Sequence, residues 1–274
     1  MMNRRTRLVW SIASLVVIGM ATAGSPLHAQ AGAGAQPPAM QAPASRTLVT
    51  TTQVKPDMVT AYQELIQNEA VPAYKKAGIP FRWVFTNGPV GPGFTYVSAQ
   101  PIANYAQFDQ GPMLRSAMGA ESFAKYTAKL RPMIVSTNGV INTLIPSASL
   151  QSFSEKPPAW VILTSVEVLP GRGAEYTSIT TNEILPALKK AGVADSWMFA
   201  TNFGGSPAQR TIVTPISNWA QLDQPSPLSK SIGAEAAQKL NQKRIVLTTN
   251  PETVVLRFVP ELSYGAPKRP TGTQ

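Results

Sequence analysis

Two stretches of eleven residues, NEAVPAYKKAG at 68–78 and NEILPALKKAG at 182–192, decide the fold, because the second repeats the first 114 positions later. The same offset gives 27 identities over the 78 ungapped positions from Val54 to Arg131. Average composition would give roughly one identity in sixteen positions. The chain therefore contains a duplication, and both copies are expected to form the same structural unit.

Each stretch has the composition of a helix end. Lys75 and Lys76 place cations at the negative end of the helix dipole, and Gly78 can adopt the left-handed conformation that closes a helix. Upstream, apolar residues recur at helical spacing, which predicts helices over 57–77 and 171–191. Pro72 and Pro186 are expected to interrupt these helices, because proline has no N–H for the carbonyl four residues earlier.

The remaining elements also come in pairs. Clusters of β-branched and apolar residues predict strands at 46–54 and 160–168, 81–86 and 195–201, 94–100 and 209–214, and 135–145 and 248–259. A second helical region in each copy starts at a predicted N-cap, Asn104 or Asn218, with Gln107 or Gln221 as its reciprocal partner. It breaks at Gly119 or Gly233 and runs to about Lys129 or Lys243.

Each copy is therefore a ferredoxin-like βαββαβ unit, with two helices on one face of a four-stranded antiparallel sheet. The other face of each sheet needs a cover, and two units in one chain can supply it to each other. We expect an α+β fold in which the two tandem units pack sheet to sheet as a pseudo-dimeric α/β barrel with the helices outside. Further self-association of the whole chain remains open.

The segments outside the repeats have a different composition. Residues 1–29 have a basic start, an apolar run and small-residue cleavage sites after Ala23 and Ala29, a pattern typical of a signal peptide, with cleavage after Ala29 favoured. An uncleaved membrane anchor is the alternative. Residues 30–45 are predicted to be a disordered linker, 147–158 a linker between repeats at 46–146 and 159–262, and 263–274 a flexible tail. We expect an exported protein, periplasmic or secreted, without stable membrane insertion after cleavage.

The composition excludes several chemistries. There is no cysteine, and His28, the one histidine, lies in the predicted signal peptide. Disulfides, iron–sulfur ligation, thiolate nucleophiles and zinc sites built on cysteine or histidine are excluded, and the mature chain would also lack histidine bases and haem ligands. We therefore predict no cofactor and no metal. The formal net charge is +10, but the lysines are scattered, so nucleic-acid binding is not expected.

The helix entries at 54–57 and 168–171 and the Pro-Ala-x-Lys-Lys-Ala-Gly helix ends resemble those of the NIPSNAP-like branch of the dimeric α/β-barrel superfamily. The resemblance covers both copies. It implies the barrel fold and a relation to a superfamily of cofactor-independent monooxygenases, haem-degrading enzymes, isomerases and members of no established activity. Many of those enzymes use a histidine, which the predicted mature chain lacks, so this departure from the family argues against haem.

Six side chains are candidate ligand-binding residues. Glu69 follows Tyr62 by seven residues, nearly two helical turns, which predicts that both face the sheet, and the same holds for Glu183 and Tyr176. The alternative is a glutamate at the helix margin with its carboxylate in water. Aromatic residues alternate along a strand in both copies, beginning at Trp83 and Trp197; they are core residues or a ligand platform. The predicted set is Tyr62, Glu69, Trp83, Tyr176, Glu183 and Trp197.

These candidates predict a protein that binds a small, largely apolar molecule in a pocket between sheet and helices. No catalytic residue can be assigned. A cofactor-independent monooxygenase or isomerase using Glu69 or Glu183 is one alternative, and an interaction protein with a packed interior and no pocket is another. A large enclosed cavity would favour the first two functions, whereas a filled interior would favour the third.

Overall fold

The computed structural model describes residues 46–109, 111–152, 154 and 156–267. The predicted signal peptide and disordered linker lie outside these residues. Among the helices of the described part, none has both the length and the apolar character needed to cross a membrane.

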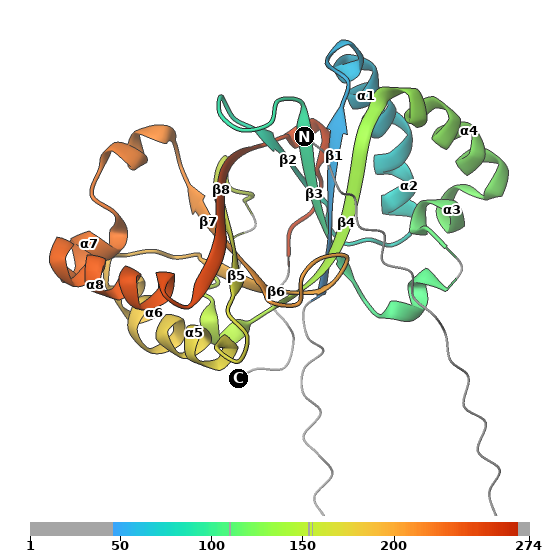
Figure 1. Cartoon of the computed structure of the whole chain (residues 1–274). Helices are drawn as coiled ribbons and strands as arrows, with labels where there is room; N and C mark the ends of the chain where they lie inside the picture. The colour runs from blue at the N-terminus through green and yellow to red at the C-terminus, as the bar shows by residue number, and fades with distance from the viewer. Residues whose placement is uncertain (1–45, 110, 153, 155, 268–274) are drawn as a thin grey trace, which may run out of the picture. The chain divides into compact units, whose positions relative to one another are not determined.

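Eight strands form one closed antiparallel barrel (Figure 1). Those of the first repeat are β1 (Arg46–Val54), β2 (Trp83–Asn87), β3 (Thr95–Ile102) and β4 (Ile134–Leu144), and those of the second are β5 (Trp160–Val168), β6 (Trp197–Phe203), β7 (Gln209–Ile216) and β8 (Thr248–Phe258). Their order is β1-β3-β2-β8-β5-β7-β6-β4, and β4 pairs back onto β1. All eight predicted strands are present, with ends shifted by at most two residues.

The two repeats are joined edge to edge at two places. β2 pairs with β8, with Phe85 opposite Phe258, and β4 pairs with β6, with Leu144 opposite Phe199. The offset of 114 converts one junction into the other, so the barrel has an internal two-fold pseudo-symmetry. Closure removes every sheet edge that a separate repeat would expose. The predicted fold class is confirmed.

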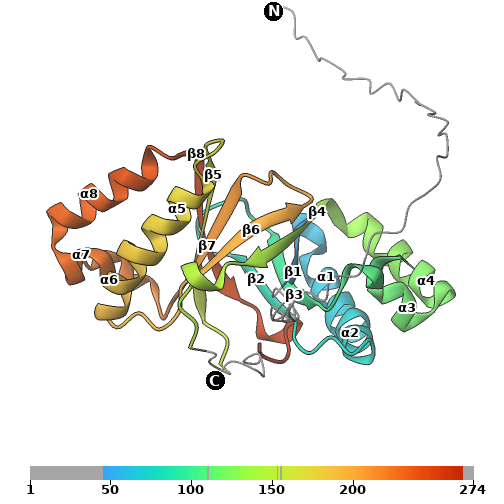
Figure 2. The ribbon, with the colours of Figure 1, turned by 90° about the horizontal axis from the view of Figure 1, so that it is seen from below.

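The helices cover the outside of the barrel on two opposite sides (Figures 1 and 2). The first repeat contributes α1 (Val59–Leu65), α2 (Val71–Lys76), α3 (Met113–Met118) and α4 (Ala120–Leu130), and the second contributes α5 (Gly173–Ile179), α6 (Leu185–Lys190), α7 (Pro227–Ile232) and α8 (Ala234–Ile245). In the first repeat Tyr62, Leu65 and Ile66 belong to one core cluster with Val84 and Tyr96 of the sheet.

The predicted proline interruption takes the form of a widened helical turn. A π-helical turn, Ile66–Ala70, connects α1 to α2, and the turn Thr180–Ile184 connects α5 to α6. In each repeat a proline follows at the start of the next helix, where its missing N–H is tolerated. The glycines that end these helices, Gly78 and Gly192, have φ of 74° and 79°, as the capping prediction requires.

The second helical region also follows the prediction in outline. Its break falls at Gly119 and Gly233, whose φ values are 83° and 85°. Asn104 accepts a hydrogen bond from the Gln107 backbone N–H at 3.1 Å, so it is the N-cap. Asn218 is not a side-chain cap, contrary to the prediction. There the side-chain oxygen of Gln221 accepts from the Ser217 N–H at 2.8 Å.

Two segments predicted to be a linker and a tail add short bridges to the barrel. Leu150 pairs with Ser196, and Tyr264 pairs with Arg82, the equivalent position in the other repeat. The start of the predicted tail contacts the barrel here, because the Arg82 and Tyr264 backbones exchange two hydrogen bonds of 2.9 Å. Both bridges lie beside the starts of β2 and β6, at one end of the barrel.

Candidate ligand-binding cavity

The barrel interior contains a cavity of about 930 Å³. Alternate residues of each strand point inward, because side chains along a strand alternate between the two faces of the sheet. Aliphatic side chains line the middle of the cavity, among them Val49, Val97, Val140, Leu163, Val213 and Val254. The volume is within the range of about 300–1,000 Å³ that small-molecule sites occupy.

One end of the cavity has an aromatic wall. Trp83 and Trp197 begin the equivalent strands β2 and β6, and their ring centroids lie 6.3 Å apart. The Trp83 ring also lies 6.5 Å from those of Phe85 and Phe258, which are 5.5 Å from each other. The Trp83 indole N–H donates to the Gly265 carbonyl at 2.9 Å. The C-terminal segment therefore holds this wall in place.

The other end of the cavity is polar and open to solvent. Thr51 and Asn138 are paired across β1 and β4, and Glu252 of β8 occupies the position equivalent to Asn138. All three line the cavity and are exposed. They form a mouth through which a ligand can enter without displacing the aromatic wall.

Asn142 supplies a polar group in the apolar middle. It lines the cavity with 5% exposure, and the Thr201 hydroxyl donates to its Oδ1 at 3.0 Å. Its NH₂ group has no protein acceptor within the described part of the chain. A buried amide that keeps a free donor can orient a ligand carbonyl or hydroxyl, since an unused donor is costly.

The segment between the repeats helps to enclose the aromatic end. Gln151, Lys156 and Pro158 line the cavity. Asp195 anchors this segment, because it accepts hydrogen bonds from both the backbone N–H and the hydroxyl of Ser152, the first at 2.7 Å. Residues predicted to be a linker thus belong to the wall of the cavity.

The six predicted site residues are divided between the two faces of the sheet. Trp83 and Trp197 line the cavity. Tyr62 and Tyr176 are on the outer face, beneath the helices, with exposures of 5% and 0%. Neither they nor the two glutamates line the cavity, so this cavity lies on the opposite side of the sheet from the pocket that the sequence predicts.

Each candidate glutamate forms an ion pair between helices. Lys129 of α4 donates to Glu69 at 2.7 Å, and Lys243 of α8 donates to Glu183 at the same distance. The glutamate side chains are 35% and 41% exposed, which corresponds to the helix-margin alternative. Partly exposed pairs of this kind contribute about 0–1 kcal/mol to stability.

The buried tyrosines remain protonated over a wide pH range. Burial raises the pKa of Tyr62 from 10.0 to about 12, although the nearby Arg82 charge opposes the shift. Burial also raises the pKa of Tyr126 above its ordinary value. At neutral pH these phenols are hydrogen-bonding groups without charge.

Neither face of the sheet offers a metal site. No group of three His, Cys, Asp or Glu side chains comes together within the described residues. In the cavity, Glu252 and Asp195 are far apart in the strand register, at the mouth and the aromatic end. Their arrangement therefore does not create a donor set for a transition metal.

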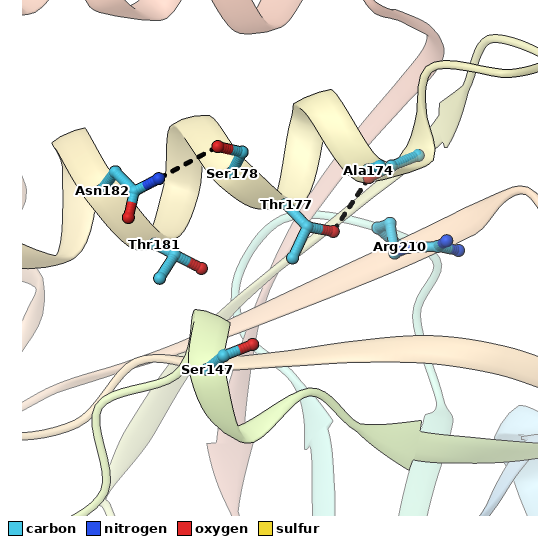
Figure 3. A pocket seen from close by; sticks show the side chains of 8 residues that line it. Ser147, Ala174, Thr177, Ser178, Thr181, Asn182 and Arg210 are labelled. Atoms are coloured by element: carbon cyan, nitrogen blue, oxygen red, sulfur yellow. Dashed lines mark hydrogen bonds between the residues drawn. The ribbon is translucent and has the colours of Figure 1, made fainter.

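A second, shallower depression lies on the outside of the second repeat (Figure 3). It measures about 570 Å³ and lies between α5 and Arg210 of β7. The Thr177 hydroxyl donates to the Gly173 carbonyl and Asn182 donates to Ser178, so two of its polar side chains bond within their own helix. This arrangement makes it a weaker candidate than the barrel cavity.

Sequence reasoning misses Asn142 and Glu252 as cavity residues. Neither belongs to a motif, and the duplication places Leu256 at the position of Asn142 and Asn138 at that of Glu252. Strand alternation places Asn142 on the same face as Val140 and Leu144, but it does not show that this face points inward. The enclosing role of Gln151, Lys156 and Pro158 has no signal in the sequence.

An eight-stranded antiparallel barrel made from two βαββαβ units with external helices is the fold of the dimeric α/β-barrel superfamily, contained here in a single chain. No protein-family model and no curated protein sequence matches the chain. Similarity is found among solved structures. A "putative monooxygenase" from Lactobacillus acidophilus is 8% identical, with a TM-score of 0.54, over 81% of this chain and 98% of its own.

Another solved structure, an anthrone oxidase-like protein, is 12% identical, with a TM-score of 0.55, over 82% of this chain and 94% of its own. At these identities the similarity establishes the fold alone. A NIPSNAP family protein from Agrobacterium tumefaciens overlaps only 35% of this chain and 90% of its own, at 11% identity and a TM-score of 0.30.

Proposed function

We propose that this protein binds a small molecule with an aromatic or otherwise apolar body inside the barrel. The cavity of about 930 Å³, lined at one end by the rings of Trp83, Phe85 and Trp197, is the observation that supports this function. A packed interior, which an interaction protein without a pocket would have, is not present in the described barrel. The ligand class is the one expected from the sequence, but the proposed site is inside the barrel, on the other face of the sheet from the predicted pocket.

The lining favours a ligand that is apolar at one end and polar at the other. An aromatic group against Trp83 and Trp197 would gain about 0.5–1.5 kcal/mol beyond its area of burial. The Asn142 NH₂ group would donate to a carbonyl or hydroxyl oxygen of the ligand. Polar or charged parts would remain near Asn138 and Glu252, where the mouth is open to water.

A cofactor-independent oxygenase or isomerase is the second candidate function. It is favoured by the fold shared with proteins described as a monooxygenase and as anthrone oxidase-like. Glu252 is a carboxylate at the mouth of the cavity and would replace Glu69 and Glu183 as the candidate base. Consumption of dioxygen, or rearrangement of a bound ligand, would distinguish catalysis from simple binding.

The sequence motifs at 68–78 and 182–192 place the protein, in our proposal, in the NIPSNAP-like branch. We also propose that it is exported and binds its ligand in the periplasm or outside the cell. Residues 1–29, on which export depends, are outside the described part of the chain. Their removal from the mature protein can be checked by N-terminal sequencing of material from the native host.

Filling the cavity tests the binding proposal. Leu163→Trp would place a bulky ring in the middle of the barrel, whereas Thr253→Trp would add the same ring to an exposed, outward position on the adjoining strand β8. The probe is 1-anilinonaphthalene-8-sulfonate, followed by its fluorescence. We expect one saturable site in the wild type, at least tenfold weaker binding in Leu163→Trp, and wild-type binding in Thr253→Trp.

A double variant locates the site relative to the sheet. Glu69→Gln with Glu183→Gln removes both carboxylates on the helical face and is expected to leave probe affinity unchanged. Loss of binding in this variant, with Leu163→Trp still binding, would return the site to the position predicted from sequence. Absence of saturable binding to the wild type, together with no small molecule seen by native mass spectrometry of protein from its host, would refute the proposal.

A further inference from the structure

We propose that the first repeat contains a buried site for a small anion, centred on Arg82 and separate from the barrel cavity. Arg82 precedes β2, and its side chain lies on the outer face of the sheet, because the neighbouring Trp83 points inward. The residue is only 6% exposed. This inference does not depend on the ligand proposed for the barrel.

Three polar side chains lie in a row across neighbouring chain segments. Tyr264 pairs with Arg82 on one side through an isolated antiparallel bridge. On the other side, the pairing of Trp83 with Ala99 continues to place Gln100 of β3 next to Arg82. Gln100 is 3% exposed. Neighbouring strands are about 4.8 Å apart, so one small ion can reach donors from all three.

All three side chains have a buried polar atom without a partner among the described residues: Arg82 Nε, Gln100 Nε2 and the Tyr264 hydroxyl. One bond of the guanidinium is accounted for, from Arg82 Nη1 to the Leu262 carbonyl at 3.2 Å. No carboxylate forms an ion pair with Arg82 within the described part of the chain. Each unsatisfied buried donor costs about 1–3 kcal/mol, and an unpaired buried charge costs more.

The surrounding phenols do not supply the missing negative charge. The Arg82 guanidinium lies 5.1 Å from the centroid of the Tyr74 ring, and its charge also acts on Tyr62 and Tyr264. Burial raises the pKa of Tyr62 and of Tyr264 to about 12 in each case, so both are neutral at pH 7. A cation among neutral hydroxyls and an amide donor is an environment suited to an anion.

The second repeat has the same fold without these groups. At the offset of 114, Arg82 corresponds to Ser196 and Gln100 to Thr214, while Leu150 corresponds to Tyr264. The surrounding tyrosines change with them, since Leu188 and Leu240 stand where the first repeat has Tyr74 and Tyr126. The second repeat thus folds with small hydroxyl side chains and leucines at this place, so a buried cation is not required for folding.

We infer a weakly hydrated halide, chloride or bromide, or a single carboxylate group as the ligand. The three donors come from three adjacent segments of the chain, an arrangement suited to one small anion. Two of the three donors are uncharged, so one negative charge balances Arg82. Such an anion would link Tyr264, and with it the C-terminal segment, to the first repeat.

Bromide provides a direct probe. Crystals of the full mature chain containing bromide should show an anomalous peak within about 3.5 Å of Arg82 Nε and the Tyr264 hydroxyl. In solution, bromide at about ten times its Kd should raise Tm by about 3–5 °C relative to equal ionic strength of sodium fluoride, since that excess favours folding about elevenfold.

Two variants make the solution test specific. Arg82→Ser combined with Tyr264→Leu copies the second repeat and should lose the bromide-dependent shift. Arg131→Gln removes one exposed charge and should keep it. The wild-type measurements stand even if the double variant does not fold. No anomalous peak at this position and no difference between bromide and fluoride in the wild type would overturn the proposal and leave water as the acceptor.

Discussion

At the scale of single residues, the buried tyrosines at equivalent positions of the two repeats, Tyr62 and Tyr176, have different arginine partners. Tyr176 accepts a hydrogen bond of 3.1 Å from Arg244 at the end of α8, whose guanidinium also lies 5.3 Å from its ring centroid. Tyr62, at the equivalent position, has Arg82, which precedes β2, as its nearby cation. Each tyrosine therefore has an arginine beside it, but the two arginines stand at positions that are not equivalent in the two copies.

Ionisation of Tyr62 is expected to make stability fall at alkaline pH. The unfolded tyrosine releases its proton near pH 10, whereas the folded side chain retains it until about pH 12. Stability is therefore fully present below pH 10 and is lost as pH rises toward 12, by up to about 1.4 kcal/mol per pH unit for each such group. Urea unfolding between pH 9 and 12 should show a shallower loss in Tyr62→Phe. Equal slopes would mean that Tyr62 ionises without unfolding.

At the scale of elements, the β6–β7 hairpin approaches the backbone of β4 closely at a junction between repeats. Gly204 has φ of 83°, and a Cβ there would lie 2.1 Å from the Gly139 carbonyl oxygen of β4. Gly192, at a helix end, has a similar φ of 79° but open space around the Cβ position. A side chain at Gly192 would meet only backbone strain, whereas one at Gly204 would meet backbone strain and a steric clash.

Replacing these glycines by alanine should give different losses of stability. Gly192→Ala should lower the free energy of unfolding by about 1 kcal/mol, because only the left-handed conformation is strained. Gly204→Ala also forces the hairpin away from β4 and should cost about 2–3 kcal/mol or more. Chemical denaturation measures both free energies of unfolding. Equal losses would show that the hairpin moves freely and that the β4–β6 junction does not depend on this contact.

At the scale of the whole molecule, the barrel is stable because each repeat covers the exposed edges and inner face of the other. A separate first repeat would leave the edges of β2 and β4 unpaired and would expose Trp83, Phe85 and the rest of its inner face. Exposed strand edges beside a large apolar patch favour association. The barrel therefore behaves as one folding unit.

Residues 46–150 expressed alone are accordingly expected to form a homodimer or to aggregate. A homodimer would rebuild the barrel with two copies of the first repeat, since the β2–β8 and β4–β6 junctions are equivalent. Size-exclusion chromatography with light scattering determines the mass directly. A stable, soluble monomer with native-like circular dichroism would contradict the mutual-cover argument.

Most of the fold could be predicted from the sequence, because its signals are local and occur twice. The Lys-Lys-Ala-Gly helix ends, the prolines at 72 and 186 and the strand patterns each depend on near neighbours in the chain, and the duplication supplied an independent check. The predicted site was less complete. Trp83 and Trp197 do line the cavity, whereas Tyr62 and Glu69 lie on the opposite face of the sheet.

The sequence by itself determined the duplication, the βαββαβ order and the absence of cysteine. Only the tertiary structure decided which sheet face encloses space. Helical periodicity shows which residues of a helix are buried, but it cannot show whether the sheet beneath has a filled or a hollow second face. That depends on barrel closure, which brings β2 to β8 and β4 to β6 across more than fifty residues of chain and sets eight inner faces around one cavity.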